Sequence, residues 1–126
     1  MYIDRIVVHC SDSPHGRGDG AEDIHYWHKQ RGWSGIGYHY VIKEDGRIEN
    51  GRPQYWEGAH VRGHNANTLG ICLIGKDEFT PDQFDSLRGL LDRLRVEHPS
   101  AVIVGHRDLD SSKTCPNFDV QHWYKG

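Results

Sequence analysis

Hydrophobic residues in this chain gather into three mostly apolar runs, separated by segments of mixed or helical pattern. The runs are Ile3–His9, Leu69–Ile74 and Ala101–His106, and the first is rich in β-branched residues. Runs of this length and composition are typical of strands that are buried on both faces of a sheet. Two of the three predicted strands end in a histidine, at His9 and His106.

Two other segments carry apolar residues at helical spacing. The sequence TPDQ at residues 80–83 has a capping-box residue at each end and a proline at the first helical position. It predicts a helix that begins there and ends near residue 98. Residues 21–31 place Ile24 and Trp27 three positions apart, which predicts a shorter amphipathic helix.

The segments between these elements carry turn signals. Residues 38–42 and 47–49 flank an Asp-Gly pair, which favours a tight hairpin turn because that pair accepts positive φ angles. Residues 11–20 and 52–67 are predicted to be irregular connections.

Strands that alternate with helices predict an α/β fold with helices packed on a sheet. A chain of 126 residues is short enough for a single core, so we expect one domain.

The charge balance excludes some classes of partner. The chain has 15 Lys and Arg against 18 Asp and Glu, a net charge of −3. This balance does not favour binding to nucleic acid or to an anionic membrane surface.

No apolar run approaches the roughly 18 residues of a membrane span, and residues 1–5 do not begin a signal peptide. We therefore expect synthesis without an export signal.

Histidine and cysteine indicate the chemistry. The three cysteines, Cys10, Cys72 and Cys115, are an odd number, which favours reduced thiols over disulfides, and ten histidines invite a search for metal ligands. Because ligands bind beyond the carboxyl ends of strands in open α/β sheets, His9 and His106 can converge with Cys115. Two histidines and a cysteine would leave a zinc ion one open position, as in catalytic sites. Hydrogen-bonded histidines without a metal are the alternative.

Several motifs resemble one known family. They are RIVVHC at residues 5–10, WHKQRGW at 27–33, GYHYVIKEDG at 37–46, GAH at 58–60, GHNANTLGICLIG at 63–75, GHRD at 105–108 and KTCPNFD at 113–119. In this order they resemble the zinc-dependent N-acetylmuramoyl-L-alanine amidases of type 2, which include phage lysozyme-type endolysins and peptidoglycan recognition proteins. The resemblance implies a single amidase domain over residues 1–126, with a central mixed β-sheet flanked by α-helices.

The resemblance also implies site residues. It makes His9, His106 and Cys115 the ligands of one zinc ion per chain, and Tyr38 and Lys113 the catalytic groups near it. Lys113 would supply positive charge where the oxyanion develops. Tyr38 would either orient the attacking water or relay a proton to the leaving amine. The bond cleaved would join N-acetylmuramic acid to L-alanine in peptidoglycan.

Other residues are expected to contact substrate or to serve the fold. His60 and Asn67 match family positions near the cleft, where they either bind substrate or hold local turns. Aromatic rings cover sugar faces well, so three aromatic residues are candidates for the substrate groove: Trp33, Tyr55 and Trp56. The alternative is that these rings belong to the core.

Alternation along strands and helix periodicity predict where further groups point. His39 is expected to face away from Tyr38, and Cys10 away from His9. Cys10 and Cys72 are expected to be small buried hydrophobes, and the helical histidines His25 and His28 to be solvated.

Three other functions share this resemblance: a non-catalytic peptidoglycan-binding module, a polymerase-regulating protein and an intracellular amidase that recycles muropeptides. The cysteine ligand together with Tyr38 and Lys113 favours an enzyme, and the short chain favours a phage or prophage endolysin. We expect a monomer made in the bacterial host cytoplasm that acts on the cell wall or periplasm. The expected partner is peptidoglycan, with no nucleic acid and no membrane, and polymerase binding stays open.

Overall fold

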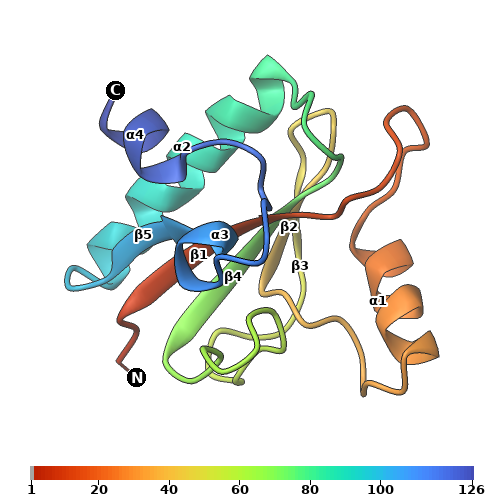
Figure 1. The fold of residues 1–126 in the computed structure, drawn as a ribbon, viewed down its shortest axis with the longest axis horizontal. Coiled ribbons are helices and arrows are strands. Elements are labelled where there is room, and N and C mark those ends of the chain that lie inside the picture. The colour runs from red at the N-terminus through yellow and green to blue at the C-terminus, as the bar shows by residue number, and fades with distance from the viewer. Residues whose placement is uncertain (1) are drawn as a thin grey trace.

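A five-stranded sheet lies at the centre of the computed structural model, which describes residues 2–126 (Figure 1). Its strand order is β3-β2-β4-β1-β5. The strands are β1 (Arg5–Cys10), β2 (Tyr40–Ile42), β3 (Ile48–Asn50), β4 (Thr68–Leu73) and β5 (Val102–Gly105). The helices are α1 (Ala21–Gln30), α2 (Pro81–Glu97), α3 (His106–Leu109) and α4 (Val120–Lys125).

The sheet is mixed, as the family resemblance implies. Strand β1 pairs in parallel with β4 on one side and with β5 on the other. Strand β2 is parallel to β4 and antiparallel to β3, and these two strands form the predicted hairpin. Because β1, β4 and β5 run the same way, the residues that follow them meet at one edge of the sheet.

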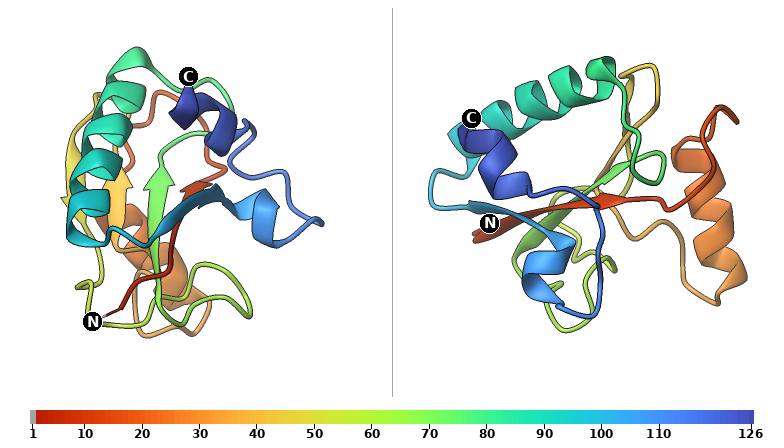
Figure 2. Two further views of the ribbon diagram at one scale, coloured as in Figure 1. Left: turned by 90° about the vertical axis from the view of Figure 1, so that its left-hand side faces the viewer. Right: turned by 45° about the horizontal axis from the view of Figure 1, so that its top comes forward.

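The two faces of the sheet pack against different elements. Ile6 and Val8 on β1 belong to a core that includes Leu87 and Leu91 of α2 and Val120 of α4. Figure 2 shows α2 and α4 on one side of the sheet, with α3 and the connection before β4 on the other. Alternation along β1 therefore turns the neighbouring side chains, including His9, away from α2.

Helix α2 begins as its sequence predicts. Thr80 Oγ1 accepts a hydrogen bond from Gln83 N at 3.1 Å, and Thr80 N donates to Gln83 Oε1 at 2.9 Å. This reciprocal pair satisfies two of the backbone donors that a helix start leaves open. The capping box is thus confirmed.

Two short helices are absent from the sequence prediction. Helix α3 starts at His106, where Asp108 Oδ2 accepts from Gly105 N at 2.8 Å. Helix α4 starts after Asp119, whose side chain accepts from His122 N at 3.1 Å. Helices of four and six residues span too little of a helical period to stand out in the sequence.

Helix α4 belongs to the same core as the sheet. The Arg88 guanidinium of α2 donates to the backbone oxygens of Trp123 at 3.0 Å and Tyr124 at 3.1 Å.

Among the helices within residues 2–126, none has the length and apolar composition that crossing a membrane requires.

Candidate metal centre

Three side chains from distant parts of the chain converge at one edge of the sheet. His9 lies near the end of β1 and is 1% exposed, His106 is the first residue of α3, and Cys115 lies between α3 and α4. One potential ligand atom from each lies within 4.8 Å of those from the other two. The structure therefore brings together the three predicted metal ligands.

Backbone contacts hold Cys115 beside the two histidines. Its carbonyl oxygen accepts from Arg107 N at 2.8 Å, next to His106. Its Sγ atom accepts from Cys10 N at 3.0 Å, next to His9. The loop after α3 is thus tied to both elements that carry the histidines, β1 and α3, although its sequence shows no regular pattern.

The donor set fits zinc. Two imidazoles and a thiol are the nitrogen and sulfur ligands that Zn²⁺ prefers, and three protein ligands leave a fourth position for water or substrate. Burial lowers the pKa of His9 well below its usual value, with added repulsion from His60 and His106. Burial also lowers the pKa of His106. Both rings are therefore neutral near pH 7, the form that binds a metal.

A cleft of about 400 Å³ opens beside these ligands. Tyr38 lines it, and its ring centroid lies 5.1 Å from that of His9. The pKa of Tyr38 is raised well above its usual value, mainly by burial. The nearby sulfur atoms of Cys72 and Cys115 raise it further. The Tyr38 hydroxyl thus keeps its proton and can donate a hydrogen bond.

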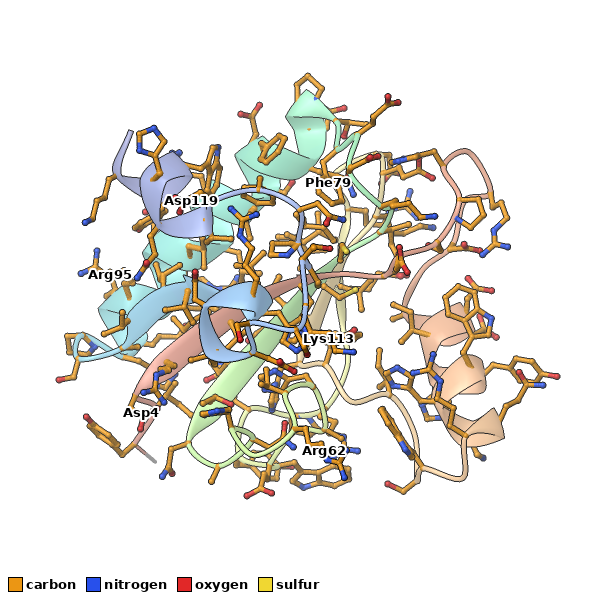
Figure 3. All side chains as sticks on the ribbon, in the orientation of Figure 1. Asp4, Arg62, Phe79, Arg95, Lys113 and Asp119 are labelled. Carbon is orange, nitrogen blue, oxygen red and sulfur yellow. The ribbon has the colours of Figure 1, made fainter. Side chains whose placement is uncertain are left out.

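Lys113 lines the same cleft from the loop that follows α3 (Figure 3). Its side chain is exposed, and its backbone N donates to Asp110 O at 3.0 Å, which closes a turn. Its positive charge contributes to the lowered pKa of His106. A cation and a phenolic donor therefore flank the three potential ligands.

Arg31 is a further cleft residue that the sequence did not identify. It lies just after α1 and lines the cleft with Tyr38, and its guanidinium carbon is 5.7 Å from the centroid of the Trp33 ring. Trp33, predicted to bind substrate, is 39% exposed and lies beside Arg31. A cation directly after a helix usually indicates only interaction with the helix dipole, so the sequence offered no specific signal.

Asn67 does not lie near the metal cluster. It precedes Thr68, which pairs with Arg5 at the opposite end of β1 from His9. Its φ is 59°, and its carbonyl oxygen accepts from Asp4 N at 2.9 Å. Asparagine tolerates this left-handed conformation, which supports the local turn role, and the substrate contact stays a prediction.

Two other predicted groove residues also lie apart from the metal cleft. Tyr55 and Trp56 are 73% and 56% exposed and line a separate pocket of about 230 Å³ that includes Asn67. Neither ring lines the cleft that holds the three ligands.

His60 is buried, and both of its ring nitrogens have protein partners. Its Nδ1 lies 2.9 Å from His9 Nε2, and its Nε2 lies 3.1 Å from Thr68 Oγ1. Burial, with repulsion from His39 and His106, lowers the pKa of His60 to about 3. Both ring nitrogens of His60 therefore serve contacts within the protein, and its contact with substrate stays a prediction.

The predicted orientation of Cys10 is wrong. Cys10 is buried, as expected, but its Sγ lies 3.6 Å from Cys115 Sγ and it lines the metal cleft. Cys10 is the last residue of β1. The alternation of side chains within a strand does not determine which distant segments pack at the strand's end, and here the loop that carries Cys115 packs beside Cys10.

The predicted solvation of the helical histidines is wrong for His28. Its ring is buried, and its Nδ1 accepts from Gly37 N at 2.9 Å. His25 Nδ1 accepts from Ile36 N at 3.0 Å. The segment after α1 folds back over the helix, which a pattern confined to the helix does not reveal.

His39 does not line the metal cleft, and backbone groups hold both of its ring nitrogens. Its Nδ1 accepts from Gly70 N at 3.0 Å, so its Nε2–H donates to Trp56 O at 2.8 Å.

Comparison with known proteins gives consistent matches. Residues 1–118 match the family described as N-acetylmuramoyl-L-alanine amidase. The chain is 42% identical to the endolysin of Enterobacteria phage K11, over 96% of this chain and 85% of that protein. It superposes on N-acetylmuramoyl-L-alanine amidase LysC from Clostridium intestinale URNW with a TM-score of 0.86 and 33% identity, covering 98% and 82% of the two chains. Drosophila PGRP-LB matches with a TM-score of 0.81 and 28% identity, covering 91% and 75%.

Proposed function

Since the chain belongs to the family of N-acetylmuramoyl-L-alanine amidases, we propose that it hydrolyses its amide substrate at a zinc centre formed by His9, His106 and Cys115. The substrate is peptidoglycan, and the bond is the one between N-acetylmuramic acid and L-alanine. One observation carries the proposal: the three potential ligand atoms gather within 4.8 Å beside an open cleft.

The protein groups around the ligands suit hydrolysis of an amide. When bound, zinc supplies a Lewis acid for the carbonyl and lowers the pKa of its bound water. Lys113 places a positive charge at the cleft, where the carbonyl oxygen gains negative charge in the transition state. A side chain on an exposed loop can reach this position without the cost of burying a charge.

Tyr38 acts as a hydrogen-bond donor. Its hydroxyl stays protonated, because burial raises its pKa. The oxygen of a protonated hydroxyl can accept a hydrogen bond from the attacking water and so orient it. Alternatively, the hydroxyl can donate its hydrogen toward the departing amine. Both predicted roles for Tyr38 are compatible with this position.

The endolysin relatives support action on the bacterial cell wall. We propose that the whole chain forms one amidase domain, because α4 lies beyond the matched residues yet packs on the same core as the sheet. The polar loops around the cleft suit a glycan with attached peptides more than an apolar ligand.

A pair of histidine variants tests the function. His106→Ala removes a proposed ligand, and His122→Ala removes an exposed histidine of α4 as a matched control. Both proteins and the wild type are incubated with purified sacculi, and released peptides are identified by mass spectrometry and N-terminal labelling.

We expect wild type and His122→Ala to release peptides that begin with L-alanine, and His106→Ala to release almost none. Loss of zinc from His106→Ala should accompany this loss of activity. Equal activity of all three proteins would refute the proposed centre, and release of fragments without new L-alanine termini would refute the proposed bond.

A further inference from the structure

A chain of hydrogen bonds leads from the proposed zinc ligand His9 into the protein interior. His9 Nε2 lies 2.9 Å from His60 Nδ1, and His60 Nε2 lies 3.1 Å from Thr68 Oγ1. All three residues are buried. Since a neutral histidine donates with one ring nitrogen and accepts with the other, the direction of this chain decides which nitrogen of His9 is free.

The direction is set at Thr68. Its Oγ1 lies 2.8 Å from the carbonyl oxygen of His64 and 3.1 Å from that of Asn65. Carbonyl oxygens can only accept, so the single hydroxyl hydrogen of Thr68 goes to them. The Thr68 oxygen then accepts from His60 Nε2–H. His60 Nδ1 consequently has no hydrogen and accepts from His9 Nε2–H.

We propose that His60 is a positioning residue that holds His9 in its Nε2–H tautomer and so presents His9 Nδ1 to zinc. This inference rests on the proposed zinc centre. Histidine ligands usually donate their second ring N–H to a fixed acceptor, which sets the tautomer and the ring orientation. In this protein the acceptor is a second imidazole, which Thr68 anchors to two backbone carbonyls.

The position of the His60 ring is itself fixed by its neighbours. Asn65 Oδ1 accepts from the backbone N of His60 at 2.8 Å and of Val61 at 2.9 Å. A Cβ atom at Gly70 would lie 2.6 Å from His60 Cγ, and one at Gly58 would lie 2.6 Å from His60 Cδ2. Two glycines thus leave the space that the ring fills, and the ring has little room to turn.

Three variants separate the hydrogen bond from simple packing. His60→Leu removes the acceptor for His9. His60→Asn keeps an acceptor, because its Oδ1 takes the place of Nδ1. His122→Asn on exposed α4 is the matched control. For each protein, competition with a chromogenic chelator gives the zinc dissociation constant, and long-range ¹H–¹⁵N correlation spectra give the tautomer of His9.

In the zinc-loaded wild type we expect His9 to be protonated at Nε2 and bound through Nδ1. We expect His60→Leu to weaken zinc binding by about 10- to 100-fold. In the metal-free His60→Leu protein, His9 should populate both tautomers, because its Nε2–H loses its acceptor. His60→Asn should recover most of the affinity and the single tautomer, and His122→Asn should match the wild type.

Thr68→Val provides a second route if His60→Leu fails to fold, as judged by circular dichroism. It keeps the shape of the side chain but removes the oxygen that accepts from His60. We expect weaker zinc binding and a mixed His9 tautomer in this variant too.

Unchanged zinc affinity in both His60→Leu and Thr68→Val would overturn the inference, as would binding of zinc through His9 Nε2. Failure of His60→Asn to recover affinity would also overturn it, because packing alone would then explain the loss. A wild type that binds no zinc would instead refute the proposed function, so the two failures are distinguishable.

Discussion

The histidines of this chain differ in what their ring nitrogens bind. His9 and His106 face the cleft, His60 supports His9, and His28 and His39 accept hydrogen bonds from backbone N–H groups. Their residue type in the sequence is the same, and the local pattern singled out only His9 and His106, because each of them ends a predicted strand. The task of a buried histidine depends on partners from other segments, which the local pattern does not contain.

His28 predicts how stability depends on pH. Burial, with repulsion from Arg31 and Arg52, lowers its pKa to about 4 from an unfolded value of 6.5. Between these values the unfolded chain binds a proton that the folded protein does not, so the free energy of unfolding falls as the pH falls from 6.5 toward 4.

Urea unfolding of the metal-free protein over this range measures the effect. His28→Asn keeps an acceptor for Gly37 N but cannot take up a proton, so its stability should fall less steeply than that of the wild type. Identical slopes for the two proteins would contradict the assignment.

Lys113 is predicted to act on the reaction and not on the metal. We expect Lys113→Ala to retain zinc and to lose about 10²- to 10³-fold in kcat, as when one charge-stabilising group is removed. Lys125→Ala, an exposed lysine on α4, is the control and should be fully active. Loss of zinc from Lys113→Ala would show that the residue maintains the site's structure instead.

Tyr38 gives a related prediction. Tyr38→Phe removes only the hydroxyl, so zinc content should stay at the wild-type level while kcat falls about 10²- to 10⁴-fold. Tyr26→Phe, at an exposed position of α1, should leave the rate unchanged. Wild-type turnover by Tyr38→Phe would remove the hydroxyl from the mechanism.

At the scale of elements, prediction succeeds where the signal is local. The capping box of α2, the Asp-Gly hairpin turn and the apolar runs of β1, β4 and β5 each lie within a few residues. Helices α3 and α4 are short and held by contacts to other segments, so their sequences carry little periodicity. The register of β1 against β4 also depends on distant residues.

The capping box of α2 is open to a direct test. Thr80→Ala removes the oxygen that accepts from Gln83 N and donates to Glu44 O. We expect the free energy of unfolding to fall by about 1 kcal/mol, with zinc content unchanged. Ser100→Ala, at an exposed position after α2, should have no measurable effect in the same urea titration.

At the scale of the whole molecule, the order of the strands creates the site. Because β5 lies beside β1 and parallel to it, the end of each strand delivers one histidine to the same edge. The sequence predicted the α/β class and the strand ends, but strand order follows from packing of the entire core. Cys115 was a candidate third ligand because it follows His106 closely in the sequence, whereas the role of Lys113 was expected only from the family resemblance.

The same topology places Asn67 away from the three potential ligands. Asn67 lies close in sequence to β4, yet it sits at the start of that strand, whereas the ligands gather at the ends of β1 and β5. A motif match places a residue in the family order and not at a particular end of the sheet.

Stepwise return of zinc to the chelated protein tests whether cleavage depends on a zinc ion bound to the chain. Zinc is removed from the purified chain, its absence is verified by elemental analysis, and release of L-alanine-terminated peptides from sacculi is followed as zinc is added. We expect no cleavage without zinc and full recovery at one zinc per chain. Cleavage by the zinc-free protein, or zinc binding without recovery of cleavage, would contradict this expectation.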